Sequence, residues 1–252
     1  MVIAVIPALG RFPLLTHTVD RLYNRNGVDH VIIVGGREEK EFCRGTRAEF
    51  VAFRNNPLGS KWNAGFLAAR AHKPDACLFV GSSDWISDNW LSIMMPYTAE
   101  YDLVGTPGCY FMHLTGGEPM ACEWAGYIGR RADESIGIGR LISARILDRI
   151  GWQPFDWWLE RSLDYSMQEK CIKAAGKLHL VRTPELKSVS ISTDRWPNKH
   201  QFSDHYNGKL KSKIINEPGK WADRHFPEWR QVFNQYSHET AENGDSFGQI
   251  RI

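Results

Sequence analysis

Asp84 has the most informative position of the acidic residues in the sequence. It follows an apolar segment, residues 76–80, and the small residues Gly81, Ser82 and Ser83. A carboxylate with small neighbours at the end of a strand can approach a cation that a ligand carries, and Mg²⁺ is typically held by one or two carboxylates together with substrate phosphates. An acid in this position can also simply cap the turn before the next helix. Position alone therefore leaves both metal binding and turn capping open.

Arg11, Lys61 and Asn63 are placed where they could bind an anion. Arg11 comes just after the first predicted strand, and Lys61 and Asn63 precede or open the second predicted helix. A cation and the backbone N–H groups of a helix N-terminus suit a pyrophosphate group. A solvated lysine and an asparagine in a first helical turn are the structural alternative, and the residues alone favour neither.

Several common functional motifs are absent from the sequence. It contains no G-x-x-x-x-G-K-[ST] phosphate loop, no H-E-x-x-H pair and no G-x-S-x-G turn. Gly137 and Gly139 lack the third glycine of a dinucleotide fingerprint and do not follow the first strand, which argues against a Rossmann dehydrogenase. The five cysteines are widely spaced and contain no C-x-x-C pair, which argues against a disulfide framework and a zinc knuckle.

The composition is that of a soluble globular protein. Of 252 residues, 42% are hydrophobic and 24% are charged, and the net charge of +2 does not by itself indicate a nucleic-acid-binding protein. No apolar stretch approaches the ~18 residues of a membrane span, and the N-terminus has no basic leader. Together with the cysteine spacing, these features predict a cytoplasmic protein with no membrane partner.

The first 84 residues alternate buried strands with amphipathic helices. Apolar runs predict strands at 2–6, 30–34, 49–53 and 76–80, and helical spacing predicts helices at 11–23 and 60–72. This alternation predicts an α/β fold with a doubly wound, mainly parallel sheet and helices on both faces. Ligands of such sheets bind at the carboxyl ends of the strands, where residues 7–11, 35–36 and 81–84 are expected to gather.

The pattern becomes less regular after Asp84. We expect helices at 87–95, 142–150 and 158–175, strand-like segments near 102–105, 110–113 and 124–128, and a last strand at 178–181. Beyond Pro184 the chain becomes polar, basic and aromatic. The sequence therefore predicts a core of residues 1–185 and a C-terminal extension of residues 186–252.

The order of these segments resembles the glycosyltransferases of the A-type nucleotide-sugar fold, especially the large family-2-like inverting group. The resemblance covers roughly residues 1–182 and rests on the order and spacing of short segments. These are Pro7-Ala8, Gly35-Gly36, the run from Asn56 to Gly65, the run from Leu78 to Asp84, Ile138 to Ser143, Ile150 to Asp156, and Ser162 to Tyr165. It implies a glycosyltransferase-A-like fold and the transfer of a sugar from a nucleotide diphosphate, most simply UDP, to an acceptor hydroxyl.

The resemblance also implies a metal, Mn²⁺ or Mg²⁺, which Asp84 would hold against the diphosphate. The Asp-x-Asp motif of the family appears here as Ser82-Ser83-Asp84 and keeps only its last acid. Metal binding is therefore expected to be weaker, or to be completed by another ligand. His200 is the first candidate for that ligand and His205 the second, and Lys199 would neutralise charge on the leaving diphosphate.

The remaining site residues follow from the same resemblance. Inverting transfer needs a base for the acceptor hydroxyl, and the implied base is Asp164, with Glu160 as the second candidate. Either acid could instead only favour a helix N-terminus, and Asp156 is expected to be a structural cap. Donor contacts are implied for Pro7, Ala8, Arg11, Gly36, Lys61, Asn63, Ser83, Asp84 and Lys199.

Aromatic residues near these positions suggest where an acceptor could bind. Trp157 and Trp158 offer flat faces for a sugar or a base, although paired tryptophans are as often part of a core. Residues 195–230 contain eight Lys or Arg against four Asp or Glu, interleaved with six aromatic residues. That composition fits either a lid packed over the donor or contacts to DNA carrying a hydroxymethylated base, as in phage DNA modification.

The predicted function is therefore inverting, metal-assisted sugar transfer, with DNA, a saccharide or a small molecule as the acceptor. Two other classes of protein remain open at this point. One is an inactive nucleotide-sugar-binding relative that lost its metal through Ser82 and Ser83, and the other is a nucleotidyltransferase. The latter would normally have a Gly-rich, basic first loop, and residues 7–11 are a poor version of one.

Overall fold

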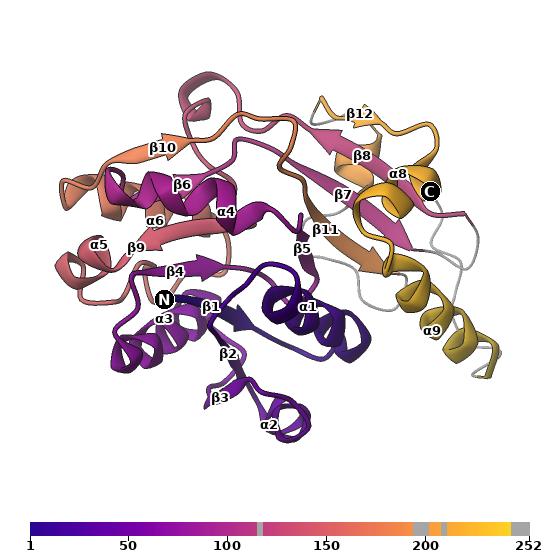
Figure 1. The fold of residues 1–252 in the computed structure, drawn as a ribbon, viewed down its shortest axis with the longest axis horizontal. Helices are drawn as coiled ribbons and strands as arrows, with labels where there is room; N and C mark the ends of the chain where they lie inside the picture. Colours follow the sequence, from indigo (N-terminus) through magenta and orange to yellow (C-terminus); the bar gives the residue numbers. More distant parts are fainter. Residues whose placement is uncertain (115–117, 194–201, 208–210, 243–252) are drawn as a thin grey trace.

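A computed structural model describes residues 1–114, 118–193, 202–207 and 211–242 and contains two sheets (Figure 1). The larger sheet has the strand order β10-β6-β9-β4-β1-β2-β3. Its strands are β1 (Val2–Pro7), β2 (His30–Gly35), β3 (Glu49–Ala52), β4 (Ala76–Phe79), β6 (Leu103–Gly105), β9 (Arg140–Ser143) and β10 (Leu178–Leu180). Only β9 runs antiparallel to its neighbours in this sheet, pairing with β4 and β6. The mainly parallel sheet predicted from the sequence is confirmed.

Helices cover both faces of this sheet, because its central strands are apolar on both sides. Ile3 and Val5 of β1 pack against α3 (Leu58–Ala69), α5 (Ala144–Arg149) and α6 (Leu163–Lys173). Ala4 and Ile6 face α1 (Phe12–Asn24), α2 (Arg37–Arg44) and α4 (Trp90–Met94). Burying one large aliphatic side chain contributes ~1.5–3 kcal/mol, so these two layers hold the loops at the strand ends in place.

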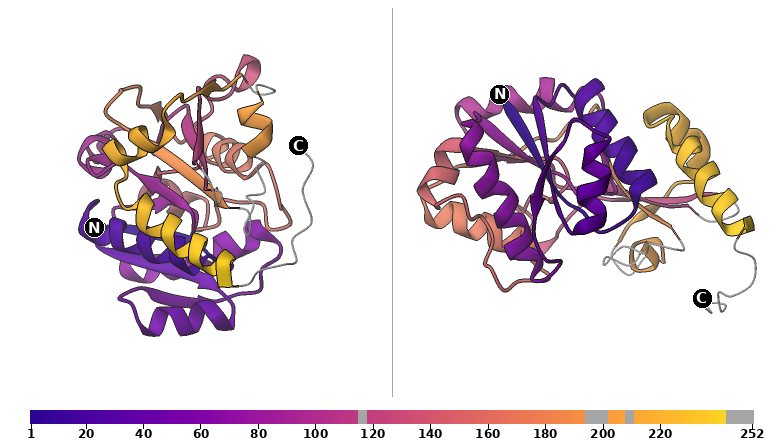
Figure 2. Two further views of the ribbon diagram at one scale, coloured as in Figure 1. Left: turned by 90° about the vertical axis from the view of Figure 1, so that its right-hand side faces the viewer. Right: turned by 90° about the horizontal axis from the view of Figure 1, so that it is seen from below.

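The smaller sheet has the order β12-β8-β7-β11-β5. Its strands are β5 (Asp84–Ile86), β7 (Cys109–Leu114), β8 (Met120–Trp124), β11 (Ser188–Thr193) and β12 (Lys213–Ile214). Two late helices, α8 (Pro218–His225) and α9 (Trp229–Glu242), pack on it and share a core with Trp85, Met112 and Ile191. Figure 2 shows α8 and α9 in yellow at the side of the molecule that carries this second sheet. Shorter helices are η1 (Arg70–His72), η2 (Met95–Ala99), η3 (Gly129–Arg131) and α7 (Phe202–Tyr206).

Late residues contact the early part of the chain through a strand pairing and through ion pairs. Strand β11 lies between β7 and β5 and pairs in parallel with β7 and antiparallel with β5. The guanidinium of Arg21, on α1, is 2.7 Å from carboxylates of both Asp88 and Glu228. The division into residues 1–185 and 186–252 stays a prediction, and these contacts show how closely its two parts are connected.

Some elements differ from the sequence-based expectation. Helix α2 was not predicted, because the polar segment 37–44 has few apolar residues to mark it. Helix α3 begins at Leu58 after Pro57, and Ser60 lies inside it rather than capping it. Helix α6 begins at Leu163, because Ser162 has a φ of 57° and the preceding segment does not continue the helix. None of the helices in the described part of the chain is long and apolar enough to span a membrane.

Candidate functional site

The carboxyl ends of β1, β2 and β4 bring three predicted loops to one edge of the large sheet (Figure 1). The N–H of Ala8, just after β1, donates to the carbonyl of Val34 on β2 over 2.9 Å. Ala8 is fully buried, whereas Gly36 is exposed at the surface. Parallel pairing of neighbouring strands therefore places the predicted donor-binding segments side by side.

A buried acid, Glu39, ties the first two of these loops together. Its side chain accepts hydrogen bonds from the N–H of Gly10 at 2.8 Å and from the N–H of Gly36 at 2.7 Å. Gly35 has no room for a side chain, since a Cβ there would lie 2.5 Å from Cγ of Glu39. Glu39 is 3% exposed, so its two hydrogen bonds hold the loops at Gly10 and Gly36 together inside the protein. The sequence analysis missed it because α2 was missed, although a glycine followed three residues later by Glu is a capping pattern.

Lys61 lies beneath the first loop rather than in solvent. It is 2% exposed, and its ammonium group donates to the carbonyl of Ala8 and, over 3.1 Å, to the side-chain oxygen of Asn55. The start of α3 thus delivers a positive charge to the turn that follows β1. Buried charged groups are typically hydrogen-bonded in this way.

Asn63, also on α3, bonds to a different loop from the one that Lys61 contacts. Its side-chain nitrogen donates to the carbonyl of Phe155 over 2.9 Å, and its side-chain oxygen accepts from the N–H of Phe155 over 3.1 Å. Both ends of the amide are therefore bonded to the loop that precedes Trp157 and Trp158. Asn63 therefore holds the loop at Phe155 in position.

Arg11 and Ser83 connect the first loop to the loop after β4. Arg11 has a φ of 58° and donates from Nη1 to the hydroxyl oxygen of Ser83 over 2.9 Å. Burial lowers the pKa of the Arg11 guanidinium, and the negative charge of Asp84 opposes that change. The arginine consequently adds a fixed positive charge within electrostatic reach of Asp84.

Asp84 is the first residue of β5 and lies at the junction of the two sheets. Its Oδ2 accepts from the N–H of Gly81 over 2.9 Å, and a Cβ at Gly81 would lie 2.5 Å from that oxygen. The side chain remains partly exposed. Both roles considered from the sequence are thus compatible: the carboxylate caps its own turn and still faces outward.

The residues around Asp84 fit a weakly held divalent ion. Ser82 and Ser83 are buried, and the hydroxyl of Ser83 already accepts a hydrogen bond from Arg11. Among the described residues, Asp84 belongs to no group of three or more His, Cys, Asp or Glu side chains able to hold a metal. One carboxylate suffices for Mg²⁺-type binding when phosphate oxygens supply further ligands. Lys199 and His200 lie outside the described residues.

The other predicted histidine, His205, is buried in an aromatic cluster. Its ring stacks on Phe111 with centroids 3.9 Å apart and meets the edge of Trp124 at 5.3 Å. The later aromatic residues of the extension also pack inward: Phe226 is 1% exposed and Trp229 is 3% exposed. The described part of residues 195–230 therefore packs on the second sheet, and its role as a lid stays a prediction.

Asp164 sits in the first turn of α6 and is held by two neighbours that the sequence analysis did not single out. Its Oδ1 is 3.5 Å from Nη2 of the fully buried Arg140, and its Oδ2 accepts from the hydroxyl of Tyr127 at 3.5 Å. Burial, and then the charge of Asp164, raise the pKa of Tyr127. The close approach also needs Gly137, where a Cβ would lie 2.7 Å from Oδ1 of Asp164.

A buried thiol shows that the two acids share one region. The pKa of Cys109, the first residue of β7, is raised by burial first, and then by the negative charges of Asp84 and Asp164. The carboxylates come from different elements, β5 and α6, yet both act on this residue. Geometry places Asp164 beside the carboxyl end of β4, since a Cβ at Gly137 would lie 2.6 Å from Cε1 of Phe79, the last residue of β4. Asp84 follows the same strand by five residues, and its role as metal ligand and that of Asp164 as base stay predictions.

Trp157 and Trp158 lie on the surface, with exposures of 62% and 57% and ring centroids 5.6 Å apart in an edge arrangement. Their backbone is fixed to the start of α3, because Ser60 donates to the carbonyl of Trp157 over 2.7 Å and the N–H of Gly59 donates to the carbonyl of Leu159 over 2.8 Å. The tryptophans are thus not core residues.

The acids on either side of this pair have structural contacts. Glu160 lies before α6 rather than on it and accepts from the N–H of Leu58 over 3.2 Å, so the helical spacing expected between Glu160 and Asp164 is absent. Asp156 is joined to α6 through Ser166, whose hydroxyl donates to Asp156 over 3.1 Å.

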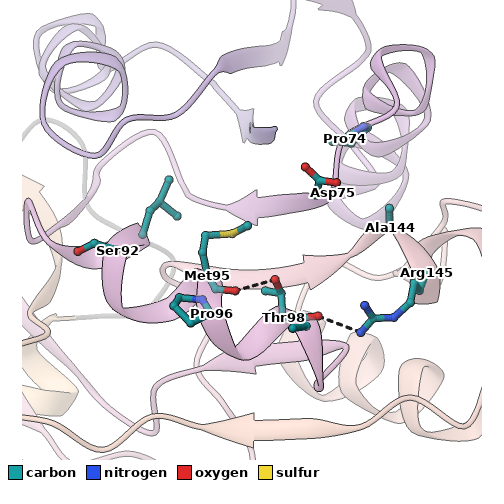
Figure 3. Close-up of a pocket in the computed structure, with 10 residues that line it drawn as sticks. Pro74, Asp75, Ser92, Met95, Pro96, Thr98, Ala144 and Arg145 are labelled. Atoms are coloured by element: carbon teal, nitrogen blue, oxygen red, sulfur yellow. Dashed lines mark hydrogen bonds between the residues drawn. The ribbon is translucent and has the colours of Figure 1, made fainter.

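A separate open pocket of about 690 Å³ lies near the amino end of β4, between η2 and the start of α5 (Figure 3). Pro74, Asp75, Met95 and Ala144 line it, and the guanidinium of Arg145 donates to the carbonyl of Thr98 across one side over 2.9 Å. None of the predicted site residues lines this pocket. Its lining contains no pair of converging acids and so offers no counterpart to Asp84 and Asp164.

Comparison with known proteins gives a fold and no family. No protein-family model matches the chain, and no curated protein matches it. Among solved structures, the mannosyltransferase PcManGT from Pyrobaculum calidifontis, in complex with GDP-Man and Mn²⁺, has a TM-score of 0.50 at 11% identity, over 98% of this chain and 76% of that one. S. aureus TarS 1–349 has a TM-score of 0.48 at 14% identity, over 77% of this chain.

The chain spans 58% of the TarS fragment's length. A 4-diphosphocytidyl-2C-methyl-D-erythritol synthase from Anaerococcus prevotii has a TM-score of 0.45 at 11% identity, over 72% of this chain and 86% of that one. The likeness to the mannosyltransferase, together with the strand order and the helices on both faces, shows the nucleotide-sugar glycosyltransferase fold that the sequence predicted.

Proposed function

We propose that this protein is a glycosyltransferase that moves a sugar from a nucleoside diphosphate to an acceptor hydroxyl with inversion. The observation that carries the proposal is that Asp164 lies beside the carboxyl end of β4, the strand after which Asp84 follows: a Cβ at Gly137 would lie 2.6 Å from Cε1 of Phe79, the last residue of β4, and 2.7 Å from Oδ1 of Asp164. Sugar transfer needs one group beside the leaving diphosphate and another beside the incoming hydroxyl. These two carboxylates, from different elements, can meet that requirement.

The donor would bind along the loops after β1, β2 and β4. The backbone at Pro7, Ala8 and Gly36 would contact the nucleoside; Ala8 is bonded to Val34, and Gly36 is exposed. Arg11 and Lys61 would add positive charge near the diphosphate, and Ser83 would hold Arg11 in place. The mannosyltransferase of similar fold was solved with GDP-Man, so GDP-mannose is tested beside the UDP-sugars.

A divalent ion, Mn²⁺ or Mg²⁺, would be held by Asp84 and by the diphosphate itself, with His200 as the proposed further ligand and Lys199 beside it. When bound, such an ion stabilises negative charge as it grows on the departing diphosphate. Asp84 is suited to this position because its turn, fixed by Gly81, keeps the carboxylate at the mouth of the site.

Asp164 would accept the proton of the acceptor hydroxyl. Inversion requires the hydroxyl to attack the anomeric carbon from the side opposite the diphosphate, which is consistent with a base on α6 and a metal ligand on β5. Arg140 provides a buried positive charge at the carboxylate, and Tyr127 orients its second oxygen.

The acceptor is proposed to be a saccharide that stacks on Trp157 or Trp158. Their exposed faces lie on the loop that leads from α5 to α6, and flat aromatic faces suit sugar rings. The described aromatic residues after residue 201 pack inward, so they supply no comparable stacking faces for the bases of DNA. The five cysteines are buried and free, which fits the proposed cytoplasmic location.

The test is a binding and turnover panel on the full chain. UDP-sugars and GDP-mannose are titrated calorimetrically with and without Mn²⁺, and the best donor is then incubated with mono- and disaccharide acceptors. A glycosyltransferase releases the nucleoside diphosphate, whereas a nucleotidyltransferase releases or consumes pyrophosphate, so the two products separate these classes. Nuclear magnetic resonance of the glycoside gives the anomeric configuration. Donor binding without turnover on any acceptor would favour an inactive binding protein.

DNA is tested as the other acceptor class by gel shift at two salt concentrations, with plain and hydroxymethylated duplexes. Binding that neutralises phosphates weakens steeply with salt because counterions are released. Absence of a shift at low salt, together with turnover on a saccharide, is the result the proposal expects.

A further inference from the structure

Two histidines and a glutamate converge on the far edge of the large sheet, away from Asp84 and Asp164. Nε2 of His30 is 2.9 Å from Oε2 of Glu49, and Nε2 of His72 is 2.7 Å from the same oxygen. The two imidazole rings have centroids 4.6 Å apart. Among the described residues this is the group of side chains that could hold a metal ion, with its three ligand atoms all within 4.8 Å of one another.

The backbone fixes all three positions firmly. His30 is the first residue of β2 and Glu49 is the first residue of β3, and the pairing of Ile32 with Glu49 sets the register between them. His72 is the last residue of η1, directly after α3, which packs on this face of the sheet. Since side chains two residues apart share a face of a strand, His30 lies on the same face as Ile32, beneath α3. The cluster thus joins two strands and a helix end.

The ligand atoms have the chemistry of a zinc site. Two imidazole nitrogens and one carboxylate oxygen form a three-ligand set that Zn²⁺ accepts, with a water molecule in the fourth position. With metal–ligand bonds of about 2.0–2.2 Å and tetrahedral angles, neighbouring ligand atoms are about 3.3 Å apart. The present separations of 2.7 and 2.9 Å from Oε2 are slightly shorter, so a small rotation of the Glu49 carboxyl group would open the space.

The cluster is also accessible. The side chains of His30, Glu49 and His72 are 27%, 35% and 34% exposed, so an ion can enter from solvent and keep a water ligand. No residue proposed for sugar transfer belongs to it, and it lies at the amino ends of β2 and β3, whereas the transfer site lies at their carboxyl ends. The ligand type differs as well, since imidazole nitrogen suits zinc and the oxygen ligands near Asp84 suit Mg²⁺ or Mn²⁺.

We propose that His30, Glu49 and His72 form an open, three-ligand binding site for a divalent transition metal of the zinc type. The ion would clamp the β2–β3 edge to the end of α3 and would stabilise the sheet that carries the donor loops. The site is independent of the proposed function, because it needs neither donor nor acceptor. The competing explanation is a metal-free cluster in which both imidazoles donate to one carboxylate oxygen.

The experiment titrates metal-free full-length protein with Zn²⁺ by calorimetry and follows Co²⁺ binding by visible absorption. We expect one ion at this site, strong absorption bands typical of tetrahedral Co²⁺, and a melting temperature that rises with Zn²⁺ concentration by mass action. His72→Gln should weaken Zn²⁺ binding by more than about a hundredfold, beyond the loss caused by an outer-shell partner. His179→Gln is the matched control, because that ring stacks on Tyr97 and Tyr101 and should leave binding unchanged.

Two further measurements make the result decisive. Asp84→Asn should retain Zn²⁺ binding, which separates this site from the transfer site. A crystal soaked with Zn²⁺ should give an anomalous difference peak within bonding distance of the Nε2 atoms of His30 and His72, and this holds even where a variant fails to fold. Absence of Zn²⁺ binding to the parent, an equal affinity in His72→Gln, or an anomalous peak elsewhere would each overturn the proposal.

Discussion

The donor side and the acceptor side of the candidate site are built in opposite ways. On the donor side, Glu39, Lys61 and Ser83 are 3%, 2% and 4% exposed, and each bonds to a neighbouring loop. On the acceptor side, Trp157 and Trp158 are 62% and 57% exposed and are fixed only through their backbone. The hydrogen bonds of the proposed donor side are already formed without a ligand, whereas the proposed acceptor side exposes two aromatic rings to solvent.

This difference indicates how the two ligands would be selected. Preorganised loops lose little conformational entropy when they bind a ligand of constant shape, which suits a nucleoside diphosphate. Exposed aromatic faces tolerate ligands that vary in size and orientation. The contrast therefore predicts that donor-side variants lose binding outright, whereas acceptor-side variants change rate or acceptor affinity and leave the donor bound.

The largest effect is expected at Asp84. Asp84→Ala should abolish metal-dependent binding of the donor while the overall fold survives, because we propose that the Asp84 carboxylate holds the metal ion. Asp84→Asn is the sharper variant, since its side-chain oxygen can still accept from the N–H of Gly81 but carries no charge. Calorimetry with Mn²⁺ measures both. Donor affinity equal to that of the parent in Asp84→Asn would remove Asp84 from the site.

The next effect is expected at Asp164. Asp164→Asn should lower the transfer rate by about two to four orders of magnitude, the usual range for a lost general base, with donor affinity unchanged. Asparagine is nearly isosteric, so its side-chain oxygen can still accept from Arg140 while its NH2 group can donate to the hydroxyl oxygen of Tyr127. Turnover and donor affinity are measured on the same preparation. Glu160→Gln is the control and should retain activity. If Asp164→Asn transferred sugar at a rate within about tenfold of the parent, Asp164 would be excluded as the base.

A smaller effect is expected at the two exposed tryptophans. Stacking on an aromatic ring is worth ~0.5–1.5 kcal/mol, so Trp157→Ala or Trp158→Ala should raise the acceptor KM by about two- to twelvefold and leave the donor Kd unchanged. Leu67→Ala, at another exposed apolar position, is the control. If donor binding fell instead, the separation between the two sides would be wrong.

The smallest effect on the reaction is expected at Asp102, which lies far from both sides and supports the sheet. Burial alone would raise the pKa of the Asp102 carboxyl. Hydrogen bonds from the N–H of Lys177 and the hydroxyl of Ser143, together with the charge of Arg145, have the larger effect, so the pKa of Asp102 is lowered. A folded-state pKa below the unfolded value of about 3.9 stabilises the protein above that pH, and the stabilisation is lost as pH falls through the folded pKa.

Urea unfolding at pH 6 and below pH 4 measures this contribution. The parent should lose more stability on acidification than Asp102→Asn does, while the donor affinity of the variant at pH 7 equals that of the parent. An identical acid response in the two proteins would show that the hydrogen bonds at Asp102 contribute nothing to it.

The sequence predicted the parallel strands well because their apolar runs, such as residues 2–6 and 30–34, can only be buried between two helical layers. It missed groups whose roles arise only from tertiary contacts. Arg140 lies within an apolar strand and gives no local sign that it meets Asp164, and Glu39 lies in a polar helix without an apolar stripe. The start of α6 was misplaced because Ser162 adopts a left-handed backbone with a φ of 57°, which no glycine or asparagine marks in the sequence.

The pairing of β5 with β11 has a consequence for how the protein forms during synthesis. Asp84 pairs with Ser190, and among the described strands β11 is the neighbour of β5 in its sheet. A nascent chain that has not yet emerged past β11 can complete the pairing of β1 with β2 and β4, which all precede β5 in the chain, but leaves β5 without its partner. Non-local strand pairing is also slow to form. The donor loops should therefore mature first on the ribosome, and the Asp84 carboxylate should reach its final position only when the last third of the chain has been made.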